Sequence, residues 1–529
     1  MASPLEIPLS LSGSFGELRQ NHFHSGWDIQ TAGKEGLNVL SVADGYISRV
    51  KISSKGYGNA IYVTHPQFKL VSVYAHLSQL KEILGQEIYR AQYAEQSFEL
   101  DKSFEPGQFP IKRGEVIARS GNSGSSGGPH LHFEIRNQMT EKTIDPSLFG
   151  FKVADISRPL IEYMSFIPKG AFDNVQRLDF HFAGESFGRE DTLYEVPDTF
   201  GVALQVKDFV LDVNHPTGIK QIITLLDGNI ISELLLDSLD FDQTKHMNGH
   251  VFYPEWSAQR ANVHRCYKLP NAPQYPFIYL EKDGWVHIKD TMVHAITCLA
   301  QDFSGNATCV YAFIKKQKSM PIPSPAQDII DWEKGGVVHA DDWNLVVPQK
   351  ALYEDAPINV QYRMKRRVED GQMKWDSLLF SVTPPSAFAQ KVYLSNDSES
   401  WRELADSLKL KLGLVKVEDD GSWSGWSKDH DGFGLGKSGQ YLLIKDTQAP
   451  MIVDVNRNKG ALTVIDLCSG IKRYKAMTKD KVWILMRYDQ KNNQLYWDTT
   501  KTNALKVDEL FIELEDYAGN KTVIPISIK

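Results

Sequence analysis

The chain has 529 residues, and 42% of them are hydrophobic, which is ordinary for globular proteins. Since one hydrophobic core seldom grows beyond about 250–300 residues, this length predicts about three or four domains. The net charge of −8 arises from 58 basic and 66 acidic residues. Because no basic run stands out, neither nucleic acid nor an anionic membrane is a predicted partner.

The cysteines argue against a disulfide-rich protein, and the apolar segments argue against a membrane-spanning one. Four cysteines are too few and too scattered for a disulfide framework or a C-x-x-C zinc site. Cys298 and Cys309 flank a turn, so a disulfide across a hairpin and two buried thiols both stay open, buried thiols being the commoner case. No stretch is long and apolar enough to span a bilayer, and residues 1–5 lack a charged segment followed by an apolar core.

Short strands punctuated by glycine and asparagine dominate the first part of the chain. Apolar residues gather at 39–42, 46–50 and 60–63, and Asp-Gly and Gly-Asn turns precede two of these runs. Apolar runs bounded by turn residues are typical of strands. The pattern therefore predicts a compact antiparallel sheet.

The strand pattern lapses between Ser78 and Pro110. Apolar residues there recur at helical spacing behind Ser78, a candidate N-cap. These residues are Leu80, Ile83, Leu84 and Ile88. Because long connections are commonly functional, we expect the segment 81–110 to be an insertion that forms one wall of a substrate groove.

The stretch GGPHLHFEIR at 127–136 combines two histidines with an alternating apolar pattern. Side chains alternate between the two faces of a strand, so His130 and His132 should share one face. The opposite face should enter the core with Leu131, Phe133 and Ile135. Two histidines would then face one groove from a rigid strand.

An imidazole and a carboxylate, His24 and Asp28, lie far upstream of these histidines. Gly26 between them lets the chain bend. Zinc that is bound by two histidines and one carboxylate keeps a position open for water. The two motifs, HxxxD and HxH, together indicate a metal site.

These ordered motifs resemble the signature of the lysostaphin/LytM-like M23 family of zinc endopeptidases. Flanking pieces are similar to that family too, namely FGELR at 15–19, YAHL at 74–77 and GNSG at 121–124. The resemblance covers roughly the first 150 residues and implies a small β structure with an open groove. It implies Zn²⁺ as the cofactor, His24, Asp28 and His132 as metal ligands, and His76 and His130 as catalytic residues.

The resemblance also implies a function, a zinc metalloendopeptidase that hydrolyses peptide cross-links or stem peptides of bacterial peptidoglycan through a metal-activated water. The alternative is a non-catalytic LytM-like scaffold that binds cell wall or activates an amidase. Such relatives usually lose zinc ligands, which this sequence retains. An adhesion or glycan-binding protein with a vestigial head is a third hypothesis. Since the wall lies outside the inner membrane, we expect a periplasmic or extracellular protein whose signal peptide is absent from these residues.

An internal repeat follows the first 150 residues. Each copy opens with a proline that suits a linker or an edge, and closes on a turn in which Gly-Asn supplies positive φ between two strands. This pattern predicts β-sandwiches that resemble the immunoglobulin-like modules of secreted bacterial enzymes. The matching pieces are 155–161 and 446–452, 218–220 and 470–472, and 302–306 and 516–520.

The predicted fold class is therefore mainly β, a LytM-like antiparallel β catalytic domain followed by β-sandwich (Ig-like) modules. The first copy of the repeat is the longer one and must carry insertions, for which the polar stretch 244–276 is the candidate. PIPSP at 321–325 predicts a stiff linker. Strand-like runs at 358–362 and 378–382 predict a further β domain. The predicted domains are 1–150 (M23 peptidase), 155–316 (Ig-like with insertions), 326–445 (β domain) and 446–529 (Ig-like).

Overall fold

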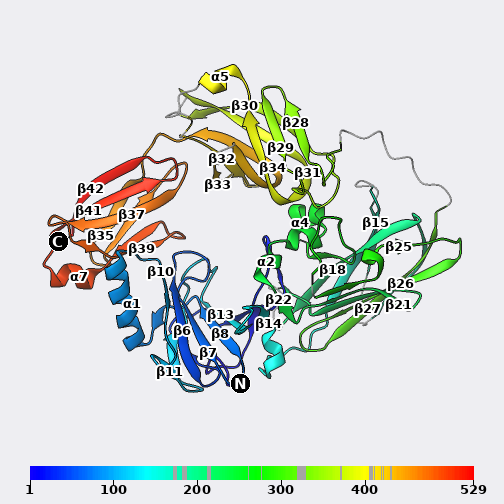
Figure 1. Cartoon of the computed structure of the whole chain (residues 1–529), viewed down its shortest axis with the longest axis horizontal. Coiled ribbons are helices and arrows are strands. Elements are labelled where there is room, and N and C mark those ends of the chain that lie inside the picture. The colour runs from blue at the N-terminus through cyan, green and yellow to red at the C-terminus, as the bar shows by residue number, and fades with distance from the viewer. Residues whose placement is uncertain are drawn as a thin grey trace.

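The chain forms four lobes that follow one another in a ring-like order in a computed structural model (Figure 1). Strands dominate every lobe, so the predicted mainly β fold class is confirmed. We name them the N-terminal lobe (1–150), the second lobe (155–316), the third lobe (329–445) and the C-terminal lobe (446–528). The predicted linker at 321–325 lies outside the described residues. The structure describes all residues except 171–174, 181–186, 211–215, 260, 276, 318–328, 370–371, 404–408, 410, 419, 421, 429–431 and 529.

The N-terminal lobe consists of antiparallel sheets and one long helix. Its strands are β1 (Leu11–Gly13), β2 (Leu18–Arg19), β3 (His22–Phe23), β4 (Trp27–Gln30), β5 (Asn38–Leu40), β6 (Gly45–Ile52), β7 (Ala60–His65), β8 (Leu70–Ala75), β9 (Gln79–Leu80), β10 (Leu100–Ser103), β11 (Pro110–Ile111), β12 (Val116–Arg119), β13 (His130–Asn137) and β14 (Thr143–Ile144). The main sheet has the order β1-β4-β13-β8-β7-β6-β10, and β5-β12-β9 form a second sheet. The three runs predicted as strands are β5, β6 and β7, as expected.

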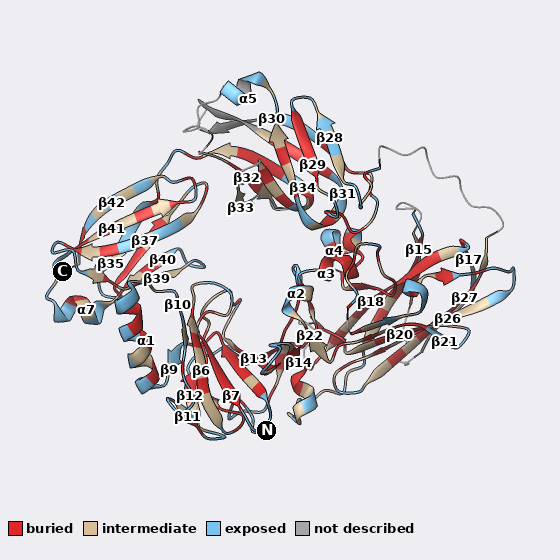
Figure 2. Ribbon diagram, in the orientation of Figure 1, coloured by how far each residue is buried: buried red, intermediate tan, exposed pale blue. Residues whose placement is uncertain are grey.

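Strand β13 occupies the middle of the main sheet, between β4 and β8. His132 lies opposite Asp28 of β4 on one side and opposite Ala75 of β8 on the other. Strand β13 is buried over most of its length (Figure 2), and the face predicted to enter the core is completely buried. The residues of that face are Leu131, Phe133 and Ile135, each 0% exposed.

The helix predicted behind Ser78 is α1 (Glu82–Glu95), but its predicted N-cap is wrong. The N-cap is Lys81, because the Ser78 hydroxyl donates to the carbonyl of Ser120 at 2.7 Å instead. The buried residues of α1 include Leu84 and Ile88. Helix α1 lies beside the C-terminal lobe (Figure 1). A short 3-10 helix, η1 (Pro146–Phe149), closes the lobe.

The second lobe contains two sheets, β16-β15-β18-β19 and β17-β27-β26-β20-β21-β24, with β23 and β25 paired to β18. The candidate insertion at 244–276 contains most of the lobe's helices, which pack into its core. The elements are β15 (Leu160–Pro168), β16 (Gln176–Asp179), β17 (Phe187–Val196), β18 (Thr199–Phe209), β19 (Pro216–Thr217), β20 (Gln221–Leu226), β21 (Asn229–Leu235), β22 (Ser238–Leu239), α2 (Phe241–Thr244), α3 (Met247–His250), α4 (Tyr253–Gln259), β23 (Val263–Arg265), β24 (Ile278–Leu280), η2 (Glu281–Gly284), β25 (Val286–His287), β26 (Val293–Gln301) and β27 (Ala307–Lys316).

The cysteines of the β26–β27 hairpin do not form a disulfide. Cys298 lies opposite Val310, and Cys309 lies opposite Leu299. The two thiols therefore leave opposite faces of the hairpin. Cys298 is buried and Cys309 is half-buried, in agreement with the free-thiol alternative.

The N-terminal and second lobes share one hydrophobic core. Strand β14 pairs with β22 across the boundary, with Thr143 opposite Leu239. The backbone N–H of Gly218 also donates to the Ser14 hydroxyl at 2.7 Å. The two lobes are thus packed against each other rather than joined by the connecting segment alone.

The third and C-terminal lobes have hydrophobic cores of their own. The runs predicted as strands in the third lobe lie in β30 and β31, as expected. Its elements are β28 (Gly336–Ala340), β29 (Trp343–Val347), β30 (Asn359–Glu369), β31 (Gln372–Asn396), α5 (Glu399–Glu403), β32 (Leu412–Val417), β33 (Trp423–Ser427) and β34 (Phe433–Lys445).

The C-terminal lobe has two four-stranded sheets, β35-β36-β40-β39 and β38-β37-β41-β42. Its likeness to an immunoglobulin-like module stays a prediction. Among the described residues no helix is both long and apolar enough to cross a membrane. The elements are β35 (Met451–Asn456), β36 (Ala461–Ile465), β37 (Ile471–Thr478), β38 (Trp483–Ile484), β39 (Met486–Asp489), β40 (Gln494–Trp497), α7 (Thr499–Ala504), β41 (Glu509–Asp516) and β42 (Lys521–Ser527).

Candidate metal centre and active site

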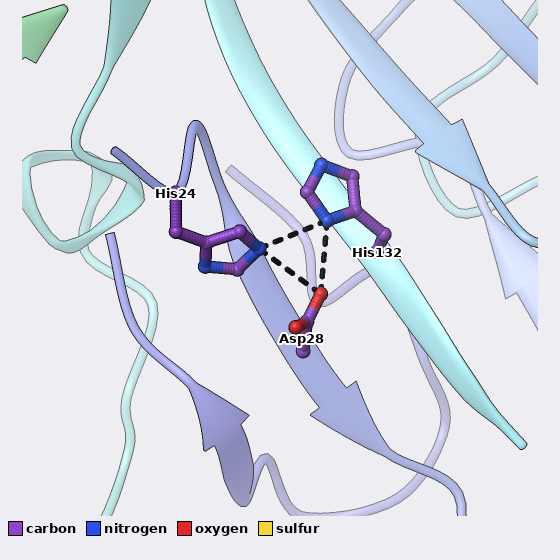
Figure 3. Close-up of side chains that lie close together, drawn as sticks. All are labelled: His24, Asp28 and His132. Atoms are coloured by element: carbon purple, nitrogen blue, oxygen red, sulfur yellow. Dashed lines mark hydrogen bonds and ion pairs between the residues drawn. The ribbon is translucent and has the colours of Figure 1, made fainter. Parts of the chain in front are cut away.

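His24, Asp28 and His132 converge between the loop after β3, strand β4 and strand β13 (Figure 3). His24 Nε2 lies 3.2 Å from His132 Nδ1 and 3.2 Å from Asp28 Oδ1. The third edge, from His132 Nδ1 to Asp28 Oδ1, measures 2.9 Å. Zinc bonds of about 2.0–2.1 Å in tetrahedral geometry would separate the ligand atoms by about 3.3 Å. The three atoms therefore already have nearly the spacing that a tetrahedral metal requires.

The outer nitrogen of each imidazole is held by an acceptor. His24 Nδ1 lies 2.7 Å from the carbonyl of Ser14, and His132 Nε2 lies 2.8 Å from Glu134 Oε1. An acceptor at one ring nitrogen fixes the N–H there and leaves the lone pair on the other nitrogen. With a metal bound, the lone pairs would lie on His24 Nε2 and His132 Nδ1, which are the atoms that face Asp28. The residues present fit a bound metal ion.

Glu134 is the residue of this site that the sequence analysis missed. It is 0% exposed, and its Oε1 also accepts from the hydroxyls of Tyr57 at 2.5 Å and Ser25 at 2.6 Å. Arg136 pairs with Oε2 at 2.6 Å. Although burial acts in the opposite direction, Arg136 and His132 hold the pKa of Glu134 far below its usual range. The alternation of β13 is the signal that could have found Glu134, because it places this residue on the face of His132.

The two carboxylates of the site, Asp28 and Glu134, stabilise positive charge on the groups beside them. Arg19 Nη2 lies 3.0 Å from Asp28 Oδ2. Burial would raise the pKa of Asp28, but the neighbouring histidines hold it well below its usual range. Burial also opposes protonation of His132, yet Asp28 and Glu134 raise its pKa to about 9. Without a metal, His132 therefore carries a proton at neutral pH.

His130 and His76 lie next to the three candidate ligands. His130 Nε2 is 3.3 Å from Asp28 Oδ1, and the rings of His130 and His76 are 4.7 Å apart. Each uses Nδ1 for a backbone carbonyl at 2.8 Å, that of Gly128 for His130 and that of Ser123 for His76. Burial, followed by His132 and His130, lowers the pKa of His76 to about 3. The structure thus brings all five predicted site residues together.

A pocket of about 550 Å³ lies beside the carbonyl that anchors His76. Asn59 and Ser123 of the N-terminal lobe line one side, and Tyr488 of the C-terminal lobe lines another. Lys491 Nζ of the C-terminal lobe donates to the carbonyl of Asn122 at 2.8 Å. The C-terminal lobe therefore borders this pocket, as does Phe98 of the predicted wall segment.

Comparison with known proteins agrees with this geometry. Residues 22–97 and 89–146 match "Peptidase family M23". An "Uncharacterized metalloprotease" of Haemophilus influenzae is 32% identical over 112 residues, which cover 21% of this chain and 18% of that protein. The "DD-carboxypeptidase/endopeptidase Mpg" of Neisseria meningitidis is 32% identical over 130 residues, which cover 24% of each chain.

Solved structures also match part of the chain. A "zinc containing peptidase" from Vibrio cholerae is 25% identical, with a TM-score of 0.20 over 27% of this chain and 37% of that chain. The chain spans 18% of the Haemophilus relative and 24% of the Neisseria relative. The aligned segment contains the two motifs that form the candidate metal centre. Residues 22–146 of the chain therefore match peptidase family M23, and they contain the candidate metal centre.

Proposed function

We propose that this chain is a zinc-dependent endopeptidase that hydrolyses peptide cross-links or stem peptides of bacterial peptidoglycan. The observation that carries the proposal is the triangle of His24 Nε2, Asp28 Oδ1 and His132 Nδ1, with edges of 2.9 to 3.2 Å. Two imidazoles and one carboxylate form a donor set that suits zinc and leaves a position for water and substrate. Peptidoglycan as the substrate implies a periplasmic or extracellular location.

The metal would be held by His24, Asp28 and His132. When bound, zinc polarises the scissile carbonyl and makes water a nucleophile near neutral pH. Arg19 would hold Asp28 in place through its second carboxylate oxygen, 3.0 Å away. Glu134 would keep the His132 ring oriented, because it accepts the hydrogen bond of the nitrogen that does not face the metal.

His76 and His130 would move the protons of the reaction. Each donates its Nδ1–H to a backbone carbonyl, so Nε2 has the lone pair. That nitrogen can accept the proton that the attacking water loses and then pass it to the leaving nitrogen of the peptide. While protonated, it can also donate to the oxyanion. The lowered pKa of His76, about 3, keeps this ring neutral at neutral pH.

The other lobes would position the peptidase domain on its substrate. The name of the Neisseria relative, a DD-carboxypeptidase/endopeptidase, supports cleavage of peptide bonds. We also propose that 155–316 and 446–529 are immunoglobulin-like modules, because both contain two sheets of mainly antiparallel strands and share the repeat. The border that the C-terminal lobe forms at the pocket would restrict which wall fragments enter.

The proposal is tested by mass spectrometry of defined muropeptides after incubation with the full chain, with and without a chelator. We expect about one zinc per chain, chelator-sensitive cleavage of a peptide bond, and loss of both zinc and cleavage in Asp28→Ala. Asp101→Ala is the matched control, because this exposed aspartate pairs with Arg49, 2.5 Å away on the same lobe, and not with the candidate metal centre. Undiminished zinc in Asp28→Ala would refute the ligand set, and zinc-loaded protein that cleaves no muropeptide would favour the non-catalytic scaffold.

A further inference from the structure

Three aspartates meet in the second lobe where the chain enters it from the N-terminal lobe. Asp155 lies in the segment between η1 and β15, Asp208 lies near the end of β18, and Asp302 directly follows β26. One carboxylate oxygen from each residue lies within 4.8 Å of the others. Asp208 and Asp302 are each 1% exposed, so two of the three charges are withdrawn from water.

The described groups around this cluster supply no positive charge. None of the three aspartates forms an ion pair with Lys, Arg or His within the part of the chain that the structure describes. Their hydrogen bonds come from neutral donors only. These donors are the backbone N–H groups of Ser157, Ser304 and Asn306, the Asn306 side-chain amide and the Thr217 hydroxyl, at 2.8 to 3.0 Å.

Asp208 supplies the observation that points to a ligand. Its Oδ2 accepts from Thr217, but its Oδ1 is buried and has no hydrogen-bond partner among the described residues. A buried carboxylate oxygen without a partner is costly. Burial, together with Asp302 and Asp155, also raises the pKa of Asp208 to about 7. The buried Oδ1 is therefore an unfilled acceptor that a cation or a proton would satisfy.

We propose that Asp155, Asp208 and Asp302 bind one Ca²⁺ ion. The donor set contains oxygen only, which suits a hard cation and distinguishes it from the histidine-rich centre of the N-terminal lobe. Ca²⁺ takes about six to eight oxygens in flexible geometry, so three carboxylates leave room for backbone carbonyls or water. Mg²⁺ demands a stricter octahedron at shorter distances and gives up its water reluctantly.

Bound Ca²⁺ would fasten the segment that joins the two lobes. Asp155 belongs to that segment, whereas Asp208 lies in a strand of one sheet of the second lobe and Asp302 directly follows a strand of the other. The next residue, Ile156, is 87% exposed, so the segment is not packed at that point. The ion would thus tie the entering chain to both sheets and fix the angle at which the lobes meet.

The repeat provides an internal comparison. Asp446, Asp466 and Asp516 form the corresponding cluster in the C-terminal lobe, again with oxygens within 4.8 Å of one another. There, both oxygens of Asp446 and both of Asp516 accept from N–H donors. That cluster lacks a buried carboxylate oxygen without a partner among the described residues. We therefore restrict the proposal to the second lobe, and Asp516→Asn is the matched control.

The test is calorimetric titration of the zinc-loaded full chain with CaCl₂, beside thermal unfolding. We expect one Ca²⁺ per chain with an apparent Kd of about 10⁻³ M or tighter, and a Tm that rises with Ca²⁺. Asp208→Asn resembles the protonated residue in shape and charge. It should therefore lose Ca²⁺ binding at least about tenfold while its Tm without Ca²⁺ stays at or above that of the wild type.

A second readout reports on the connecting segment itself. Lys152 is exposed, so a lysine-specific endoprotease should cut after it, and Ca²⁺ should slow that cut in the wild type but not in Asp208→Asn. Asp155→Asn, at a half-buried position, repeats the measurement if Asp208→Asn folds poorly. Asp28→Ala should lose zinc and keep Ca²⁺, which separates this proposal from that of the peptidase.

Three results would overturn the proposal. The first is a wild-type Tm that does not change up to about 10 mM Ca²⁺, which would mean that a proton alone satisfies Asp208. The second is undiminished Ca²⁺ binding in Asp208→Asn, or an equal loss in Asp516→Asn. The third is Mg²⁺ acting as strongly as Ca²⁺ at the same concentration, which would refute calcium as the ligand.

Discussion

Glu134→Gln tests whether the buried carboxylate behind His132 controls metal affinity. Glu134 Oε1 accepts from His132 Nε2 at 2.8 Å, and its Oε2 pairs with Arg136 at 2.6 Å. Loss of such an outer partner typically weakens metal binding by about 10–100-fold. That range corresponds to about 1.4–2.7 kcal/mol of zinc-binding free energy. We expect the variant to fall within it, because the amide oxygen can still accept from His132 but carries no full charge.

The same substitution should also lower the free energy of unfolding, for a different reason. Arg136 has a side chain that is only 7% exposed, and its next acidic neighbour, Glu141, is 4.0 Å away and mostly exposed. Removing one partner of a buried ion pair costs about 3–5 kcal/mol. Zinc affinity by competition with a chromophoric chelator must therefore be measured beside the thermal unfolding of the metal-free protein.

Arg136→Met is the matched control for Glu134→Gln. It breaks the same ion pair but leaves the Glu134 carboxylate in place for His132. We expect it to destabilise the fold about as much as Glu134→Gln and to retain zinc affinity within about threefold of the wild type. Wild-type zinc affinity in folded Glu134→Gln, or an equal loss of affinity in both variants, would refute the role assigned to the hydrogen bond.

Three further predictions follow from the site and its border. At pH 7, zinc uptake should release about one proton from His132, because its pKa of about 9 keeps it protonated without metal. This proton release should vanish as the pH rises through 9. Calorimetry in buffers of different ionisation enthalpy measures the number of protons released. His76→Ala and His130→Ala should each keep close to one zinc while hydrolysis falls about 10²- to 10⁴-fold. Zinc loss in His130→Ala with retention in His132→Ala would exchange their roles. The double variant Tyr89→Phe/Tyr93→Phe removes two hydroxyls that donate to Asp498 of the C-terminal lobe at 2.6 Å. Hydrogen exchange of the α1 amides should therefore accelerate without loss of zinc. Unchanged exchange would contradict a role of these hydroxyls in docking α1 on the C-terminal lobe.

Strand β13 shows what the alternation of side chains between two faces can predict from sequence, and what it cannot. The alternation correctly assigned Leu131 and Phe133 to the core and both histidines to the other face. The same alternation places Glu134 beside His132, but its function depends on distances to Tyr57, which is 77 residues away along the chain. A local pattern therefore predicts which face a residue occupies, and only the fold shows what that residue contacts there.

The N-cap of α1 shows how a tertiary contact overrides a local signal. Serine caps helices because its hydroxyl can accept from a backbone N–H of the first turn. The Ser78 hydroxyl instead donates to the carbonyl of Ser120, 42 residues away, and the helix begins after Lys81 without a side-chain cap. The apolar period was enough to predict that a helix exists. Its first residue could not be predicted, because the Ser78 hydroxyl is engaged by Ser120.

The candidate metal ligand His24 contacts groups that the second lobe positions, although the sequence motif lies wholly in the N-terminal one. Its Nδ1 is held by the carbonyl of Ser14, whose hydroxyl accepts from the N–H of Gly218. The preceding residue, Phe23, is 1% exposed and packs its ring 5.4 Å from that of Phe277. Both contacts join residues that are more than 200 positions apart in the sequence, so local spacing could not predict them. The second lobe thus contacts both Ser14, whose carbonyl lies against His24, and Phe23, which precedes His24. The structural unit that orients this candidate ligand therefore extends beyond the segment that matches the peptidase family.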